Sequence, residues 1–209
     1  MNSEDPGLPA ALVLAKFWQS GPVKTRLAAD LGEEQAREVY RNMVEKLWRD
    51  LEHPQLQRHL WVAPPESLEA CAAWLPGATC ARPQPEGDLA PRLQAAFAEA
   101  FSGDQAPAWA AVLGTDCPAL DAGFLLFAGR ALQEADVVIS PTLDGGYALL
   151  GLKRPQPRLF EDIPWSTPEV LETTLQRAKE MGLSVIQTAT LRDLDDVEDY
   201  EQLKAEGLL

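Results

Sequence analysis

The sequence is poor in cysteine, histidine and basic residues, and each shortage argues against a class of protein. Its 209 residues include three cysteines and two histidines, and no Cys-x-x-Cys pair is present. A disulfide scaffold and a zinc site are therefore both disfavoured. Lysine and arginine number 18 against 32 aspartates and glutamates, which gives a net charge of −14. Because phosphate backbones require a basic surface, this balance argues against a nucleic-acid-binding protein.

Long apolar runs are also missing. No stretch approaches the ~18 apolar residues of a membrane-spanning helix, and residues 1–9 lack the basic start and apolar centre of a signal peptide. We therefore expect a soluble cytoplasmic protein without a membrane span. Residues 1–9 are expected to form a flexible tail, and residues 10–209 a single domain with its own core.

Short apolar runs alternate with helical patterns along the chain. The expected strands are 10–17, 60–63, 109–114, 136–140, 147–152 and 184–188, and the expected helices are 33–52, 67–75, 89–101, 121–133, 167–181 and 196–204. The segment 81–88 is rich in proline, glycine and charge, so we expect a loop there. This alternation predicts a three-layer α/β/α sandwich with a mostly parallel sheet.

Asp116 follows a short apolar run, Ala111–Gly114, and Pro118 comes two residues later. This pattern predicts a buried strand that delivers one carboxylate to its carboxyl end, where ligands bind in open α/β sheets. A carboxylate at that edge is a natural ligand for a hard cation such as Mg²⁺, which is often shared with substrate phosphates. The alternative is that Asp116 caps a turn or the next helix.

Two cations, Lys24 and Arg26, stand in the expected loop 21–27 after the first strand. Lys24 can act as a point charge on a phosphate, and Arg26 can hold phosphate oxygens with two parallel hydrogen bonds. The spacing is not that of a P-loop. The alternative is a solvated basic loop, although the acidity of the chain makes two cations at this position less easy to explain by chance.

Asp144 is followed by Gly145 and Gly146 between two expected strands. A tight turn explains this pattern. The functional alternative is that the glycines let the backbone approach a ligand closely, while Asp144 binds a hydroxyl or assists proton transfer. Trp165 is either a stacking surface for a sugar or base, or a side chain that packs beneath the helix start.

Five acids occur among the seven residues 193–199. A helix N-terminus explains Asp196, Glu198 and Asp199, because the helix dipole favours acids there. It explains Asp195 less well, since Asp195 precedes the expected helix. A second carboxylate that meets Asp116 across the cleft would complete a cation site.

Several of these motifs occur in an order that resembles one family. The motifs are Lys24-Thr25-Arg26-Leu27, Glu86-Gly87-Asp88-Leu89, Gly114-Thr115-Asp116-Cys117-Pro118, Pro141-Thr142-Leu143-Asp144-Gly145-Gly146-Tyr147, Pro164-Trp165-Ser166-Thr167 and Asp193-Leu194-Asp195. From about residue 11 to 203 the chain resembles the selenodomain-associated transferase family, which is of the GT-A type in the nucleotide-diphospho-sugar transferase superfamily.

The resemblance implies a GT-A fold, a nucleotide-activated donor and a divalent cation, Mg²⁺ or Mn²⁺. It implies that Asp116 and Asp195 bind the metal and that Asp116 and Asp144 serve catalysis. The residues implied at the nucleotide or its phosphates are Lys16, Lys24, Arg26, Gly87 and Asp88, and those implied at the sugar or acceptor are Gly145, Gly146, Tyr147 and Trp165.

Three functional hypotheses follow. The first is metal-dependent glycosyl transfer from a nucleotide-diphospho-sugar to a small acceptor. Many such GT-A enzymes carry Asp-x-Asp, whereas Cys117 and Pro118 follow Asp116 here. A single aspartate also resembles nucleotidyltransferases of the phospholactate guanylyltransferase type, which release pyrophosphate from a nucleoside triphosphate. The third hypothesis is a non-catalytic nucleotide-binding protein. Exposed aromatic side chains would be compatible with a homodimer.

Overall fold

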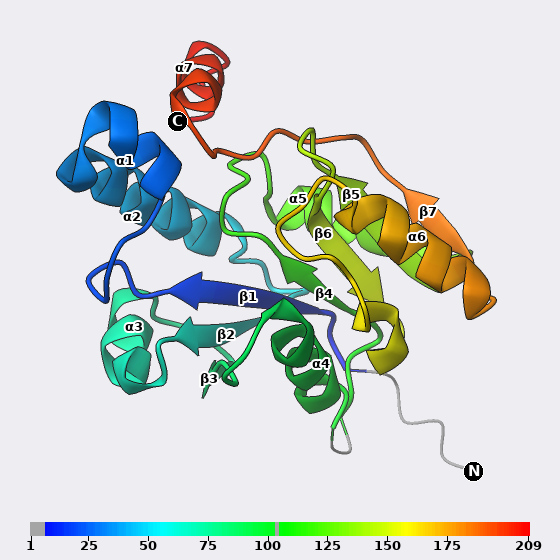
Figure 1. The fold of residues 1–209 in the computed structure, drawn as a ribbon. Helices are drawn as coiled ribbons and strands as arrows, with labels where there is room; N and C mark the ends of the chain where they lie inside the picture. Colours follow the sequence, from blue (N-terminus) through cyan, green and yellow to red (C-terminus); the bar gives the residue numbers. More distant parts are fainter. Residues whose placement is uncertain (1–6, 103–104) are drawn as a thin grey trace.

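The computed structural model describes residues 7–102 and 105–209, and it shows a twisted seven-stranded sheet between helices (Figure 1). The strand order is β3-β2-β1-β4-β6-β5-β7. The strands are β1 Ala10–Lys16, β2 Gln57–Ala63, β3 Cys80–Pro83, β4 Ala110–Leu113, β5 Val137–Pro141, β6 Tyr147–Leu152 and β7 Val185–Gln187. Only β6 runs antiparallel to its neighbours, so the expectation of a mostly parallel sheet is confirmed.

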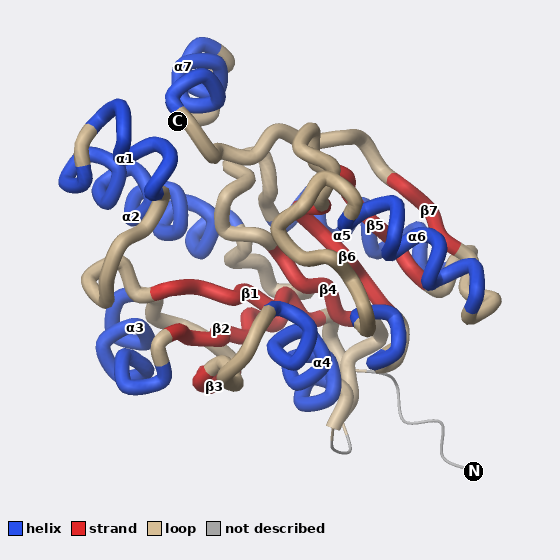
Figure 2. Tube along the Cα trace, in the orientation of Figure 1, coloured by secondary structure: helices blue, strands red, loops and turns tan. Residues whose placement is uncertain are grey.

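Seven α-helices and three short 3₁₀ turns accompany these strands in the described part of the chain (Figure 2). The helices are α1 Thr25–Leu31, α2 Glu33–Asp50, α3 Leu68–Trp74, α4 Leu89–Ala100, α5 Ala122–Arg130, α6 Val170–Glu180 and α7 Val197–Ala205, and the turns are η1 Pro65–Ser67, η2 Ala131–Gln133 and η3 Pro157–Phe160. None of these helices combines the length and the apolar character needed to cross a bilayer.

Helices cover both faces of the sheet, which gives the expected three layers. On one face, α2, α3 and α5 form an apolar cluster with the sheet that includes alternate residues of β1, such as Ala11 and Val13. On the other, α4, α6 and η3 form a second cluster that includes the intervening residues of β1. There the rings of Phe97 and Phe160 stack with centroids 5.7 Å apart. Because β1 is buried on both faces, its sequence is a continuous apolar run rather than an alternating one.

A third apolar cluster lies apart from these two layers. Leu27 of α1, Met43 of α2 and Leu203 of α7 meet there, together with Leu194 from the segment before α7. The amino-terminal helix α1 and the carboxyl-terminal helix α7 are therefore held together at one corner of the molecule (Figure 1). This corner adjoins the carboxyl end of β1.

The structure corrects three local predictions. Residues 25–31 form α1 rather than a loop, and the expected loop 81–88 contributes the short edge strand β3. Helix α6 begins at Val170, three residues after the predicted cap Thr167. The predicted caps Asp121 and Asp196 do accept hydrogen bonds from the first turns of α5 and α7. Residues 1–6 of the expected tail lie outside the described residues.

Candidate functional site

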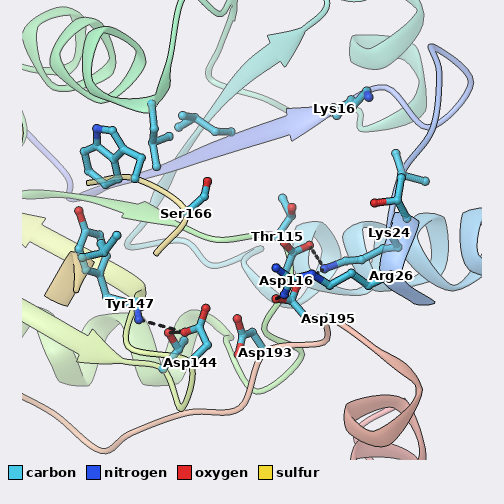
Figure 3. Close-up of a pocket in the computed structure, with 18 of the residues that line it drawn as sticks. Lys16, Lys24, Arg26, Thr115, Asp116, Asp144, Tyr147, Ser166, Asp193 and Asp195 are labelled. Carbon is cyan, nitrogen blue, oxygen red and sulfur yellow. Dashed lines mark hydrogen bonds and ion pairs between the residues drawn. The ribbon is translucent and has the colours of Figure 1, made fainter. Parts of the chain in front are cut away.

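A cleft of about 830 Å³ opens at the carboxyl ends of the parallel strands β1, β2, β4 and β5 (Figure 3). Such an edge is where open α/β sheets bind ligands. Nine of the predicted site residues line this one cleft: Lys16, Lys24, Arg26, Asp116, Asp144, Gly146, Tyr147, Trp165 and Asp195. The other three, Gly87, Asp88 and Gly145, are not among its lining residues.

Four of the lining residues are cations, and three of them, Lys16, Lys24 and Arg26, lie at the end of β1, in the loop that follows it and at the start of α1. We define the cation wall as Lys16, Lys24 and Arg26, whereas the fourth cation, Arg92, comes from α4. We define the α6 wall as Gly146, Tyr147, Trp165, Ser166 and Thr167, which lie in the β5–β6 turn, at the start of β6 and in the loop before α6. Figure 3 shows Lys16, Lys24 and Arg26 on one side, with Tyr147 and Ser166 on the other. The carboxylates lie between the two walls.

Lys24 is the most constrained residue of the cation wall. It adopts the left-handed conformation (φ 49°) immediately before α1, and its side chain is only 6% exposed. Its ammonium lies 2.9 Å from Asp116 Oδ1 and 3.6 Å from Asp195 Oδ1, and it donates to the carbonyl of Leu194. A left-handed conformation at a non-glycine residue is costly and is concentrated at functional sites. Lys24 thus holds two segments of the cleft together.

Arg26 lies in the first turn of α1 and is largely exposed. Its Nη1 is 3.3 Å from Asp195 Oδ2, so Asp195 is shared between Lys24 and Arg26. Lys16, at the end of β1, donates instead to the carbonyl of Pro22 at 2.8 Å. The hydroxyl of Tyr40 donates to the carbonyl of Lys16 and accepts from its N–H, which fixes the backbone there.

Three carboxylates converge in the cleft. Oxygens of Asp144, Asp193 and Asp195 lie within 4.8 Å of one another. Burial first, and then the charge of Asp144, raises the pKa of Asp193 to about 6. An all-oxygen donor set of this kind suits Mg²⁺ or Mn²⁺. Asp116 does not belong to this group and forms an ion pair with Lys24.

Asp193 lines the cleft but was not predicted as a site residue, although it stands in the motif Asp193-Leu194-Asp195. The available signal was the spacing of Asp193 and Asp195 in an extended segment, where residues two apart share one side. Leu194 between them is fully buried, and its N–H donates to the carbonyl of Asp116 at 2.8 Å. That contact anchors both acids next to the end of β4.

Asp144 occupies the turn between β5 and β6. Its Oδ1 accepts from the Thr142 hydroxyl at 2.5 Å and from the Gly146 N–H at 3.0 Å. Gly145 has φ +89°, and a Cβ there would lie 2.2 Å from the carbonyl oxygen of Pro168. The tight turn is therefore real. The backbone that comes close to Gly145 belongs to the loop before α6 and not to a ligand. Gly146, by contrast, lines the cleft.

The α6 wall is aromatic and polar. Tyr147 lines the cleft, but its hydroxyl is buried near Thr174, and burial raises the pKa of this phenol above its ordinary value. Trp165 is half-buried, so that it both packs on the core and faces the cleft. Ser166 is exposed and has φ +65°. No side-chain hydrogen bond of Ser166 occurs within residues 7–102 and 105–209.

Gly87 and Asp88 precede α4 and are exposed. The residues near them that line the cleft are Gln84, Leu89 and Arg92, and the sequence did not single out Gln84 or Arg92. Gln84 donates to the carbonyls of Ala15 and Trp61, and Arg92 donates to Gln84 Oε1 and to the carbonyl of Gly87. Gly87 is thus tied to the site through Arg92.

The comparisons with known proteins agree with this geometry. A family model described as an uncharacterized protein conserved in bacteria (DUF2064) matches residues 47–167. A Desulfovibrio desulfuricans G20 structure provisionally named a nucleotide-diphospho-sugar transferase is 29% identical, with a TM-score of 0.86 over 94% of this chain and 86% of that chain. No curated protein matches the sequence.

Two more distant structures share the fold. A 4-diphosphocytidyl-2C-methyl-D-erythritol synthase from Anaerococcus prevotii DSM 20548 is 12% identical, with a TM-score of 0.61 over 98% of this chain and 100% of that chain. A manganese complex of Rv0371C from Mycobacterium tuberculosis H37Rv is 15% identical, with a TM-score of 0.53 over 94% of this chain and 97% of that chain. The family and α/β fold expected from the motifs are confirmed.

Proposed function

The chain belongs to the DUF2064 family of bacterial proteins, and because it shares its fold with structures named as nucleotide-using transferases, we propose that it is a metal-dependent transferase with a nucleotide-activated donor. The reaction proposed is glycosyl transfer from a nucleotide-diphospho-sugar to a small acceptor. One observation carries this proposal: a carboxylate triad and a set of cations line the same cleft at the sheet's carboxyl edge.

The triad Asp144, Asp193 and Asp195 fits a divalent cation, because every donor is a carboxylate oxygen. Mg²⁺ or Mn²⁺ bound there would neutralise negative charge on the departing nucleoside diphosphate. Asp116, which the sequence places at the metal, is bonded to Lys24. Its part in metal binding therefore requires that Lys24 release it, and an incoming diphosphate offers Lys24 an alternative partner.

Lys24 and Arg26 supply the fixed positive charge that phosphoryl oxygens require. Both now face carboxylates, so a bound diphosphate would replace carboxylate partners rather than water. Preorganised charge of this kind contributes most when it already points to where charge develops. The two hydrogen bonds between the Tyr40 hydroxyl and the backbone of Lys16 keep the start of the first loop in place for that contact.

Nucleotidyl transfer is the second candidate, and the specific observation that favours it is the single acid before Cys117-Pro118. In that reaction an acceptor phosphate attacks the α-phosphate of a nucleoside triphosphate. The same cations and carboxylates would serve it. The product separates the two candidates, because nucleotidyl transfer releases pyrophosphate and glycosyl transfer releases a nucleoside diphosphate.

The experiment is a thermal-shift screen of nucleotides and nucleotide sugars with Mg²⁺ or Mn²⁺, followed by product analysis of the ligands that bind. A ligand at 100 times its Kd adds about 2.7 kcal/mol of stability. We expect a shift that needs both the metal and the diphosphate, and free nucleoside diphosphate among the products. Pyrophosphate from a triphosphate would favour the second candidate, and no shift with any nucleotide would reject both.

A further inference from the structure

Arg92 of α4 lines the cleft, and the proposed function gives it no part. Of the four cations there, Lys24 and Arg26 pair with carboxylates of the same chain. Lys16 and Arg92 form no ion pair with an acid in the part of the chain that the structure describes. The net charge of the chain is −14, so acids are abundant, yet none neutralises Arg92. Its guanidinium is therefore available to an anionic ligand.

Neighbouring groups hold the Arg92 guanidinium in one orientation. Its Nη1 donates to Gln84 Oε1 at 3.1 Å, and its Nη2 donates to the carbonyl of Gly87 at 2.9 Å. Gln84 is buried, and its amide nitrogen donates to the carbonyls of Ala15 in β1 and Trp61 in β2. Both acceptors of Arg92 are uncharged. Since an arginine has more N–H groups than these two bonds use, a fixed guanidinium of this kind can still hold a carboxylate or a phosphate.

Arg92 and the two paired cations belong to different faces of the sheet. Lys24 and Arg26 stand at the start of α1, which packs on α2, and α2 covers one face. Helix α4, which carries Arg92, covers the other face together with α6 (Figure 1). On that face α4 shares an apolar cluster with Tyr147 and Trp165. A ligand group at Arg92 is thus distinct from one held by Lys24 and Arg26.

The charge of the proposed donor indicates which substrate carries the group at Arg92. A nucleotide sugar has its negative charge on the diphosphate, which the proposed function assigns to Lys24, Arg26 and a metal at the carboxylate triad. A second anionic group then belongs to the other substrate. Resting on the proposed function, we propose that Arg92 binds a carboxylate or phosphate group of the acceptor, and that Gln84 is the positioning residue for Arg92.

The test is saturation-transfer NMR on the full chain with Mg²⁺ and the nucleoside diphosphate that gives the largest thermal shift. The probes form two series: glycerol, glycerate and glycerol 3-phosphate, and glucose, glucuronate and glucose 6-phosphate. Each series changes the charged group on a similar carbon skeleton. We expect an anionic member to bind about tenfold more tightly than its neutral relative, and that member identifies the group as carboxylate or phosphate. Equal binding within both series, or binding of no probe, overturns the proposal.

Two arginine variants locate the binding. Arg92→Met should lose the preference for the anionic probe, while the nucleotide-induced thermal shift stays. Arg37→Met on α2 is the matched control, because Arg37 is also half-buried and its Nε, like that of Arg92, has no hydrogen-bond partner among the described residues, but it does not line the cleft. A preference that persists in Arg92→Met overturns the proposal. So does a smaller nucleotide shift in that variant, because Arg92 would then serve the donor.

A second position keeps the test decisive if Arg92→Met does not fold. Leu89 lies three residues before Arg92 on α4, lines the cleft and is 38% exposed. Leu89→Glu places a carboxylate on the same side of the helix as Arg92, where the two can pair. The preference for the anionic probe should fall in Leu89→Glu and stay in Leu89→Gln, and the same preference in both variants overturns the proposal.

Failure of the proposed function gives a different result. It is rejected if the parent chain shows no thermal shift with any nucleotide. The two probe series are then repeated without nucleotide on the parent chain and on Arg92→Met. Loss of anion binding in the variant would keep the anion site at Arg92, and equal binding to both proteins would remove it.

Discussion

The two walls of the cleft use polar side chains in opposite ways. On the cation wall Lys24 and Arg26 are bonded to carboxylates of the same chain. On the α6 wall the Ser166 hydroxyl has no protein partner among the described residues, and the Trp165 ring borders open space. One wall must therefore exchange partners to bind a ligand, while the other is ready as it stands. The predictions below test this contrast.

The largest effect is expected at the carboxylate that faces Lys24. Asp116→Asn removes the charge that Lys24 neutralises and should lower metal-dependent release of nucleotide from its sugar donor by about hundredfold. The variant should still fold, since Asp116 is 43% exposed. Asp30→Asn, on the exposed side of α1 away from the cleft, is the control. Steady-state turnover and a thermal melt measure the two effects, and unchanged turnover would reject a role for Asp116.

The turn that positions Asp144 gives the next largest effect, on stability. In Gly145→Ala the new Cβ would meet the Pro168 oxygen at 2.2 Å and would force a left-handed alanine. We expect a loss of about 2–3 kcal/mol, or a melting temperature lower by ~5–10 °C. Gly182→Ala is the matched control. That residue has φ +69° with no atom within 4 Å, so it should cost only about 1 kcal/mol.

Lys24 tests whether the cation wall exchanges partners. Lys24→Met frees Asp116 and Asp195 from the ammonium. Mn²⁺ should then bind about tenfold more tightly when no nucleotide is present, while the metal–nucleotide complex binds more weakly. Calorimetric titration of each ligand measures both changes. Lys16→Met should leave the metal affinity unchanged, because Lys16 donates to the Pro22 carbonyl. A fall in both affinities would contradict partner exchange.

The smallest effect is a pH dependence at the triad. The pKa of Asp193 is raised to about 6 by burial and by Asp144, so a proton competes with the metal below that pH. Mn²⁺ affinity should fall, by up to about tenfold per pH unit, as the pH drops below 6. Asp193→Asn should bind Mn²⁺ more weakly and lose this slope. An unchanged slope in the variant would assign the titration to another group.

The stability of the metal-free protein should change with pH in the opposite direction, falling where the metal affinity rises. The native state binds a proton on Asp193 that the unfolded chain, with an ordinary carboxyl pKa, has already lost. The contribution of Asp193 therefore favours folding at lower pH and is lost as the pH rises through about 6. Denaturant titrations of the parent chain and Asp193→Asn at several pH values separate this contribution from the other carboxyls.

Much of the fold could be predicted because apolar runs and turn residues mark its strands and helices. The run 10–15 is apolar throughout because β1 is covered on both faces, and only the last residue of the strand, Lys16, is charged. The short elements were missed for equally physical reasons. β3 has four residues and ends in an exposed proline, so it lacks an apolar run. α6 starts late because Gly145 and the loop at Pro168 pack against each other, a contact distant in sequence.

The sequence predicts which positions contribute to the candidate site, but not which of their side chains form ion pairs with one another. Ligands bind at the carboxyl ends of such strands, so Asp116 was expected at that edge and Asp195 was expected to meet it across the cleft. Nothing local in the sequence shows that Lys24 faces Asp116, because their pairing depends on how α1 packs on α7. The place of Asp193 in the cleft could not be predicted for a similar reason, because it depends on the burial of the neighbouring Leu194, which the sequence does not show.

The ion pair between Lys24 and Asp195 joins residues that are 171 positions apart in the sequence, and it lies beside Asp116 at the end of β4. During synthesis the first strand and its loop leave the ribosome long before Asp195 exists. The nascent chain can therefore form most of the sheet before the cations and carboxylates of the cleft can pair. The protein should become able to bind a charged ligand in a single late step, when the last tenth of the polypeptide has packed against the rest.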